Sequence, residues 1–95
     1  MYSATLILGD TSQTRHLIKQ GDPMRVEFSD FPTAGHSFRF EDETMPWLTS
    51  KVDSVSYDED DEAYYVHTQN STYILEDLEE FDYEDNVVEF TLDDD

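Results

Sequence analysis

The sequence predicts a mainly β protein, a small antiparallel barrel or sandwich of seven to eight short strands. Three observations lead to this fold class. Apolar and polar residues alternate in short runs, turn-forming residues separate these runs at close spacing, and a helical period is nearly absent. The chain has 95 residues, of which 37% are hydrophobic and 14% aromatic, enough for one modest core. We therefore expect a single domain over residues 1–95, with residues 93–95 as a frayed tail.

The first half of the chain contains four expected strands. Residues 2–8 alternate between apolar and polar side chains, and Gly9-Asp10 is expected to turn the chain into a returning strand over 14–20. A second turn is expected at residues 21–23, because glycine permits positive φ and proline fixes φ. Two further strands are expected at 24–28 and 38–40, separated by a loop that contains proline and glycine.

The second half of the chain predicts a three-stranded meander over residues 51–76. Its strands are expected at 51–57, 63–68 and 72–75, and a change in alternation near Ser54 indicates a bulge or a strand start. An all-acid hairpin loop at 58–62 and a turn at 69–71 connect them. Apolar residues spaced by three then fit a short helical turn near 77–85 or an irregular crossing, before a final strand at 88–92. A helix there would make the fold α+β.

Charge is the most informative property of the sequence. The chain has 24 Asp and Glu against 5 Lys and Arg, a formal net charge of −19. Residues 1–51 are a near-neutral half with 7 acids and all 5 bases, whereas residues 52–95 are an anionic half with 17 acids and no Lys or Arg. Self-repulsion at this density opposes folding, so the layout calls for a separate explanation such as a basic partner, a salt-rich solvent or solubility.

No catalytic or metal-binding pattern stands out. Cysteine is absent, which excludes disulfides and thiolate metal sites, and the three histidines (His16, His36 and His67) occur singly. The acid run at 58–62 lacks the glycine and the ligand spacing of an EF-hand loop, so a solvated hairpin tip is favoured over a calcium site. With so many acids, a close carboxylate pair carries no information about hydrolysis. We expect a non-catalytic protein without cofactor or metal.

The acids of the second half alternate with large apolar residues. A disordered acidic tail would not need these residues, whereas a folded segment can bury them and hold the carboxylates in fixed positions. Rigid carboxylates at the charge density of duplex DNA would compete for the Lys and Arg arrays that grip DNA. The expected partner-binding residues are Asp58, Glu59, Asp60, Asp61, Glu62, Glu76, Asp77, Glu79, Glu80, Asp82, Glu84 and Asp85.

In size, charge and acid-aromatic texture, the chain resembles the DNA-mimic inhibitors that phages and mobile elements encode, including anti-CRISPR and anti-restriction proteins, and the resemblance rests on the acids of residues 52–95. The resemblance is to this class and rests on no family-specific motif. It implies an inhibitor that occupies the basic surface of a defence nuclease or another DNA-binding protein, without itself binding nucleic acid or membrane. The expected location is the cytoplasm, that of the host cell if a phage encodes the protein, and the oligomeric state is left open.

Two other interpretations fit the same composition. A halophile-type protein would carry its acids as an adaptation to salt and have an unrelated function, but its acidity should then cover the whole surface. An acidic chaperone would use residues 76–95 as an aromatic-acidic clamp on a basic, histone-like protein. Because these interpretations differ in where the carboxylates lie, their layout in three dimensions discriminates between them.

Overall fold

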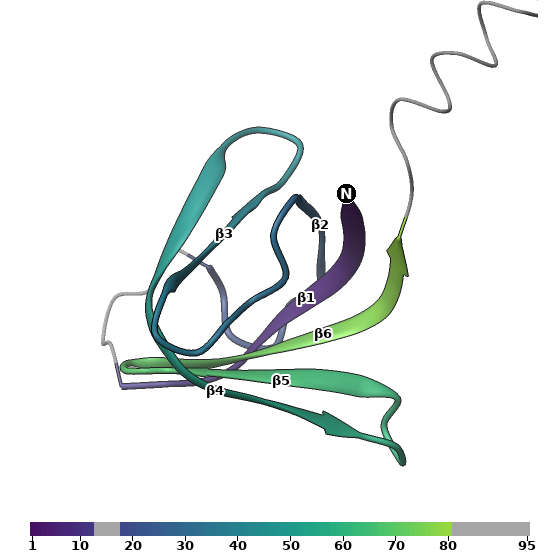
Figure 1. Cartoon of the computed structure of the whole chain (residues 1–95). Coiled ribbons are helices and arrows are strands. Elements are labelled where there is room, and N and C mark those ends of the chain that lie inside the picture. The colour runs from purple at the N-terminus through teal and green to yellow at the C-terminus, as the bar shows by residue number, and fades with distance from the viewer. Residues whose placement is uncertain (13–17, 81–95) are drawn as a thin grey trace, which may run out of the picture.

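The protein forms a closed antiparallel barrel of six strands in a computed structural model that describes residues 1–12 and 18–80 (Figure 1). The strands follow one another around the barrel in chain order, and β1 closes the ring by pairing with β6. No helix occurs in the described residues. The strands are β1 (Tyr2–Thr11), β2 (Met24–Phe28), β3 (Ser37–Glu41), β4 (Pro46–Asp58), β5 (Ala63–Thr68) and β6 (Ser71–Glu80).

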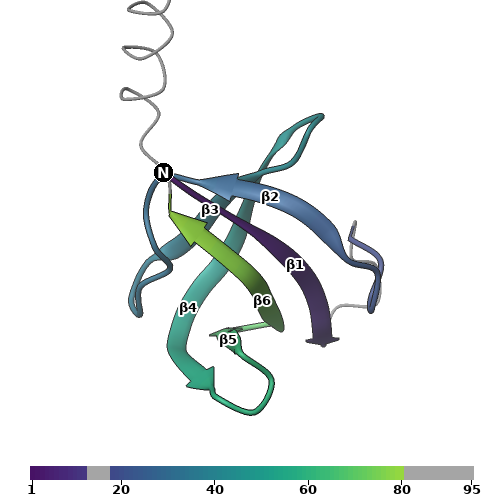
Figure 2. The same ribbon diagram turned by 90° about the vertical axis from the view of Figure 1, so that its right-hand side faces the viewer.

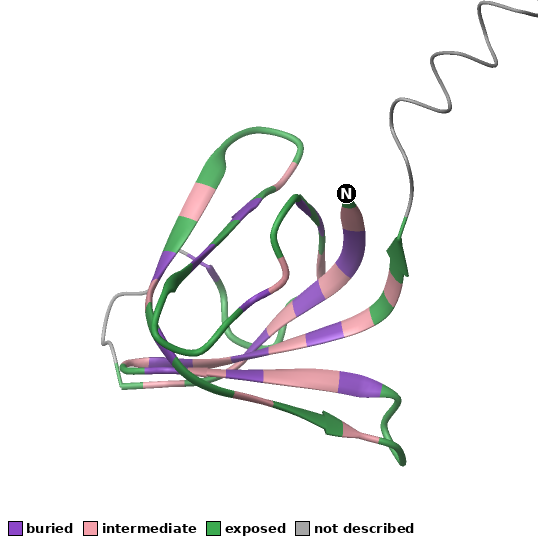
Figure 3. Ribbon diagram, viewed as in Figure 1, coloured by how far each residue is buried: buried purple, intermediate pink, exposed green. Residues whose placement is uncertain are grey.

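The core follows from strand alternation, since successive side chains point to opposite faces of a sheet. In β1 the side chains of Ala4, Leu6 and Leu8 are fully buried, and Figure 3 shows the alternation of buried and partly buried positions along this strand. Aromatic rings fill much of the interior. The buried core cluster consists of Ala4, Leu6, Leu8, Ile18, Val26, Phe28, Phe38, Phe40, Val52, Val66, Tyr73 and Leu75.

Strand β4 is the longest strand and pairs with two neighbouring strands. Its first half pairs with β3 and its second half with β5, so it starts at Pro46 rather than at the expected residue 51. The pairing with β5 slips between Val52 and Ser54, which confirms the bulge expected near Ser54. The slip changes the alternation, so that Val52 and Val55 both pack toward the interior although they are three positions apart.

The expected turn at Gly9-Asp10 is wrong, because β1 continues through both residues to Thr11. The pairing of β1 with β6 instead slips between Leu8 and Asp10, so Gly9 lies in a bulge. A Cβ at residue 9 would lie 3.1 Å from Cδ1 of Ile74, closer than ordinary contact. Glycine is therefore explained here by the close approach of β6 and not by a turn.

Six strands are observed where seven to eight were expected. In the expected strand 14–20, residues 13–17 lie outside the described residues, and Gln20 forms only an isolated parallel bridge with Leu8. The prediction of a helical turn near 77–85 is wrong for residues 77–80, because β6 continues to Glu80, which lies opposite Tyr2. Residues 81–85, the expected strand 88–92 and the tail 93–95 lie outside the described residues. The meander over 51–76 and the mainly β class are confirmed.

Candidate partner-binding surface

The acidic hairpin tip lies beside Glu76 of β6. Asp58 at the end of β4 is opposite Ala63, and Ala63 is opposite Glu76 in β6. Beyond Glu76, strand β6 diverges from the β4–β5 hairpin and pairs with β1, where Glu79 and Glu80 lie opposite Ser3 and Tyr2 (Figure 1). Both segments lie on the right-hand side of the molecule in Figure 1, and Figure 2 views the molecule from that side. We name the surface formed by residues 58–62, Glu76, Asp77, Glu79 and Glu80 the acidic face.

Hydrogen bonds order the hairpin tip. The Oδ1 atom of Asp58 accepts the backbone N–H groups of Asp60 at 2.9 Å and Asp61 at 3.4 Å, and Glu62 takes a left-handed conformation with φ of 52°. The Tyr65 hydroxyl donates to Oδ2 of Asp61 at 2.7 Å. This bond to Asp61 raises the pKa of Tyr65 above its ordinary value of 10.0. The acid run therefore has a defined conformation, as a fixed anionic surface requires.

A bulge in β6 lies among the acids at the end of this strand. Ser3 pairs with Glu79 and Thr5 with Glu76, so two residues of β6 lie opposite the single residue between them, and Asp77 has a φ of 52°. Glu79 and Glu80 are exposed, and Glu76 is half-buried.

One arginine borders this part of the face. Arg25 in β2 donates to Oγ of Ser3 at 3.0 Å and to Oγ1 of Thr5 at 3.4 Å. Its Nη2 atom also lies 3.8 Å from Oε2 of Glu79. Because both charged side chains are exposed, this ion pair contributes little stability and leaves most of the negative charge of the face uncompensated.

Aromatic side chains close the end of the barrel beneath the acidic face. Tyr57 and Tyr64 contact each other across β4 and β5, with ring centroids 4.8 Å apart, and Phe31 lies 5.1 Å from Tyr64. Phe31 continues to Tyr2 at 5.8 Å, and Tyr2 stacks on Phe28 at 5.4 Å. These rings come from β1, β2, the loop after β2, β4 and β5, and three of them, Phe28, Phe31 and Tyr57, are each next to an acid in the sequence. The aromatic side chains thus pack against one another beneath the surface that carries the carboxylates.

The acidic face contains nine of the 17 acids in the described residues. The other eight are distributed over the rest of the barrel: Asp10, Asp22, Glu27, Asp30, Glu41, Asp42, Glu43 and Asp53. Lys19, Arg39 and Lys51 lie outside the face as well. Of the predicted binding residues, Asp82, Glu84 and Asp85 lie outside the described residues. The remaining nine predicted residues form two neighbouring groups, one at the hairpin tip beside Glu76 and one at the end of β6 beside β1.

No protein-family model, curated protein or solved structure matches this chain. Within residues 1–12 and 18–80, no group of three His, Asp or Glu side chains is arranged to hold a metal ion. The same part of the chain contains no helix that is long and apolar enough to cross a membrane. Function is therefore argued from the surface itself.

Asp42 has a structural role that sequence reasoning missed. Its Oδ1 atom accepts the N–H and hydroxyl of Thr44 at 2.7 and 2.8 Å and the N–H of Met45 at 2.8 Å. Its Oδ2 atom accepts the indole N–H of Trp47 at 2.9 Å. The bond from Trp47, followed by those from Thr44 and Met45, lowers the pKa of Asp42 far below its ordinary 3.8. The spacing Asp-x-Thr-x-x-Trp was the available signal for this β3–β4 turn.

Replacing Asp42 by asparagine is expected to lower Tm at pH 7, because the amide cannot accept all four bonds as a carboxylate does. The folded pKa of Asp42 is depressed, so its stabilisation is complete above about pH 4 and is lost as the pH falls further. The difference in Tm between wild type and Asp42→Asn should thus narrow from pH 4 to pH 2, as measured by circular dichroism. The neighbouring, exposed Glu43→Gln is the control, and a pH-independent difference would contradict the assignment.

Proposed function

We propose that this protein is a non-catalytic binding protein whose acidic face occupies the basic, nucleic-acid-binding surface of another protein, as a DNA-mimic inhibitor does. The observation that carries the proposal is the register Asp58–Ala63–Glu76, which joins two acidic segments into one surface. A defence nuclease or comparable DNA-binding protein is the proposed partner, and the protein itself would not bind nucleic acid.

The spacing of the carboxylates supports mimicry of a phosphate backbone. A β-strand rises about 3.3 Å per residue, so residues 76–80 extend over about 13 Å. They carry four acids, about one negative charge per 3–4 Å of strand, and successive side chains point to opposite faces. One strand of duplex DNA carries about one charge per 3.4 Å of axis. The hairpin tip lies beside Glu76 at one end of this row and adds five acids.

Exposed aromatic surface supports a protein partner. Tyr57 is 51% exposed beside Asp58, and its ring contacts Tyr64. Tyrosine combines a large contact area with few rotatable bonds and is enriched where proteins bind proteins. A partner that grips DNA through Lys and Arg would meet carboxylates here, and Tyr57 would add contact that DNA does not offer.

Affinity capture from a host-cell lysate tests the proposal. The full-length protein is immobilised, and captured proteins are eluted with duplex DNA in one arm and with 1 M KCl in the other. Nucleic-acid-binding proteins that duplex DNA releases are the expected result, because both ligands would compete for one basic surface. Captured proteins that duplex DNA does not release would contradict mimicry. If these retained proteins were histone-like, the result would favour the acidic chaperone instead.

A second candidate, salt adaptation with an unrelated function, is favoured by one observation. Eight acids lie outside the acidic face, and the only ion pairs among the described residues are Lys19–Asp22 and Arg25–Glu79, both exposed. A halophile-type protein of this kind would fold only in concentrated salt.

Thermal melting between 0.15 M and 2 M KCl separates the two candidates. For a mimic we expect a cooperative transition at 0.15 M KCl, because the aromatic and aliphatic core does not depend on salt, with a higher Tm at 2 M as repulsion is screened. A chain that is unfolded at 0.15 M and folded at 2 M would support salt adaptation.

A further inference from the structure

Strands β2 and β3 form the weakest join in the barrel. They share a single register pair, Glu27 with Glu41, whereas the other neighbouring strands share four to eight. Beyond this pair the chain leaves β2 and enters the loop at residues 29–36. Part of the edge of β3 is therefore left without a neighbouring strand.

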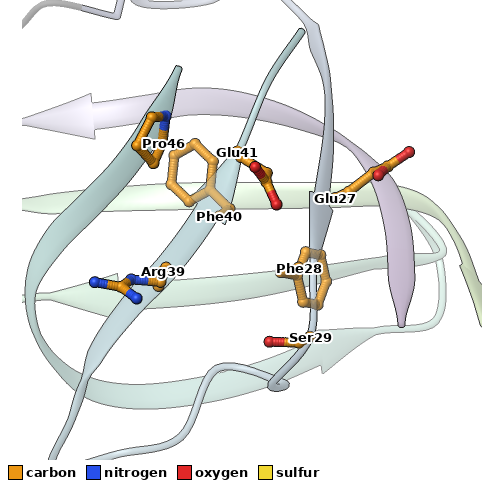
Figure 4. Close-up of a pocket in the computed structure, with 7 residues that line it drawn as sticks. All are labelled: Glu27, Phe28, Ser29, Arg39, Phe40, Glu41 and Pro46. Carbon is orange, nitrogen blue, oxygen red and sulfur yellow. The ribbon is translucent and has the colours of Figure 1, made fainter. Parts of the chain in front are cut away.

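A groove runs along this join. One hollow of about 270 Å³ is lined by residues 27–29, 39–41 and Pro46, and Figure 4 shows these side chains, which come from β2, β3 and the start of β4. A second hollow of about 510 Å³ is lined by residues 30–33 and 36–39. Arg39 lines both hollows. Phe28, Phe38 and Phe40 lie beneath them at 1–2% exposure, so Phe31 and Pro46 supply the more accessible apolar lining.

The backbone of Arg39 faces this groove. The N–H of Phe38 donates to Oγ1 of Thr49 in β4, and the N–H of Asp42 donates to the carbonyl of Met45 at the β3–β4 turn. Successive residues of a strand direct their N–H and C=O groups to opposite sides, so Phe38, Phe40 and Asp42 face β4. Arg39 and Glu41 must then face β2, where only Glu41 has a register partner.

The opposite wall also has free backbone groups. Within the described residues, neither Ser29 nor Asp30 forms a hydrogen bond, and the Arg39 side chain has no hydrogen-bond or ion-pair partner. Unpaired N–H and C=O groups on two walls with an apolar floor are what an added strand requires.

We infer that this groove binds an extended peptide segment of a partner protein, in which apolar and basic residues alternate, by strand addition to β3. Backbone bonds to Arg39 would fix the register of the peptide. Its apolar side chains would then enter the hollows between the strands, and its basic side chains would point outward to Glu27 and Glu41, since side chains alternate along a strand. Three acids, Glu27, Asp30 and Glu41, line the groove against one arginine, which favours basic over acidic side chains.

This binding site is separate from the acidic face and does not depend on the proposed function. Its residues lie in β2, β3, the loop between them and the start of β4, whereas the acidic face is built from the β4–β5 turn and β6. A basic peptide would also be attracted to any part of so anionic a protein. The experiment must therefore separate backbone pairing from charge.

The test uses a seven-residue peptide of alternating valine and lysine, acetylated and amidated at its ends, with the full-length ¹⁵N-labelled protein. A second peptide has the same sequence but is N-methylated at every other residue, which removes backbone donors and retains every charge. We expect the N-methylated peptide to bind at least about tenfold more weakly, because it cannot complete the strand ladder. The largest changes in amide chemical shift are expected at residues 28–30 and 37–41.

A matched pair of variants completes the test. Glu27→Gln with Glu41→Gln is expected to weaken binding of the unmodified peptide, whereas Glu59→Gln with Asp60→Asn, which changes the net charge equally, is expected to leave it unchanged. Equal affinity for the two peptides, shift changes centred on residues 58–62, or no binding of either peptide would overturn the inference. None of these results bears on capture of a nucleic-acid-binding protein by the acidic face.

Discussion

Replacing Phe38 by alanine is expected to destabilise the barrel by about 3–5 kcal/mol, the cost of removing a buried aromatic ring and leaving a cavity. Phe38 is 2% exposed and contacts Phe28 and Phe40, with ring centroids 5.0 and 5.3 Å away. Domains of this size are stable by about 5–14 kcal/mol in total, so the variant should lose a large share of its stability and unfold at a much lower urea concentration. Urea denaturation followed by tryptophan fluorescence measures the effect, because Trp47 stacks against Phe40.

Leu48→Ala is the control for this prediction. Leu48 lies on the neighbouring strand opposite Arg39 but is 64% exposed, so its truncation should change the free energy of unfolding by no more than about 0.5 kcal/mol. If the two variants lost similar stability, the aromatic interior would not be the source of the fold's stability.

Most strands could be predicted because alternation alone specifies a strand with one buried face. Residues 24–28 and 63–68 were predicted at the bounds that the structure has. The bulge at Ser54 could also be predicted, because it leaves a change of parity in the sequence. The bulge at Gly9 could not be predicted, because its cause is the approach of Ile74 from a strand 65 residues later. Glycine gives the same local signal in a turn and in a bulge.

The helical turn near 77–85 was predicted from a spacing of three between Leu75 and Leu78. In the structure the bulge at Asp77 produces this spacing, since it adds one residue between two side chains that pack toward the interior. A bulge and a helical turn thus leave the same short pattern. The pairing of β6 with β1, two strands far apart in the sequence, determines that the bulge forms here and not the helical turn.

Candidate site residues were predictable as residue types but not as a surface. The sequence indicates that acids dominate after Lys51, but the adjacency of the hairpin tip and β6 depends on the register of β5. A shift of β5 by one residue would move Tyr65 outside the reach of Asp61 and change which carboxylates share a face. The groove between β2 and β3 has no sequence signal, because it results from a pairing that is not made.

Reversing four charges on the acidic face is expected to weaken capture of a nucleic-acid-binding partner by about thirtyfold or more. The variant carries Glu59→Lys, Asp60→Lys, Glu62→Lys and Glu80→Lys. All four side chains are exposed and none accepts a side-chain hydrogen bond within the described residues, so the fold should be retained. Each exposed pair contributes about 0.2–1 kcal/mol, and reversal replaces attraction by repulsion, so the four effects together exceed about 2 kcal/mol. Surface plasmon resonance with the captured partner at 0.15 M KCl gives the affinity.

The matched control distinguishes a specific face from net charge. Asp10→Lys, Asp22→Lys, Glu43→Lys and Asp53→Lys change the charge of the protein by the same amount, at exposed positions outside the acidic face. If the register of β5 with β6 builds the binding surface, this variant should keep most of its affinity, because exposed charges farther away than a Debye length of about 8–10 Å are screened. Equal loss in both variants would mean that the partner senses only the total charge, and the acidic face would then have no role beyond that of the other carboxylates.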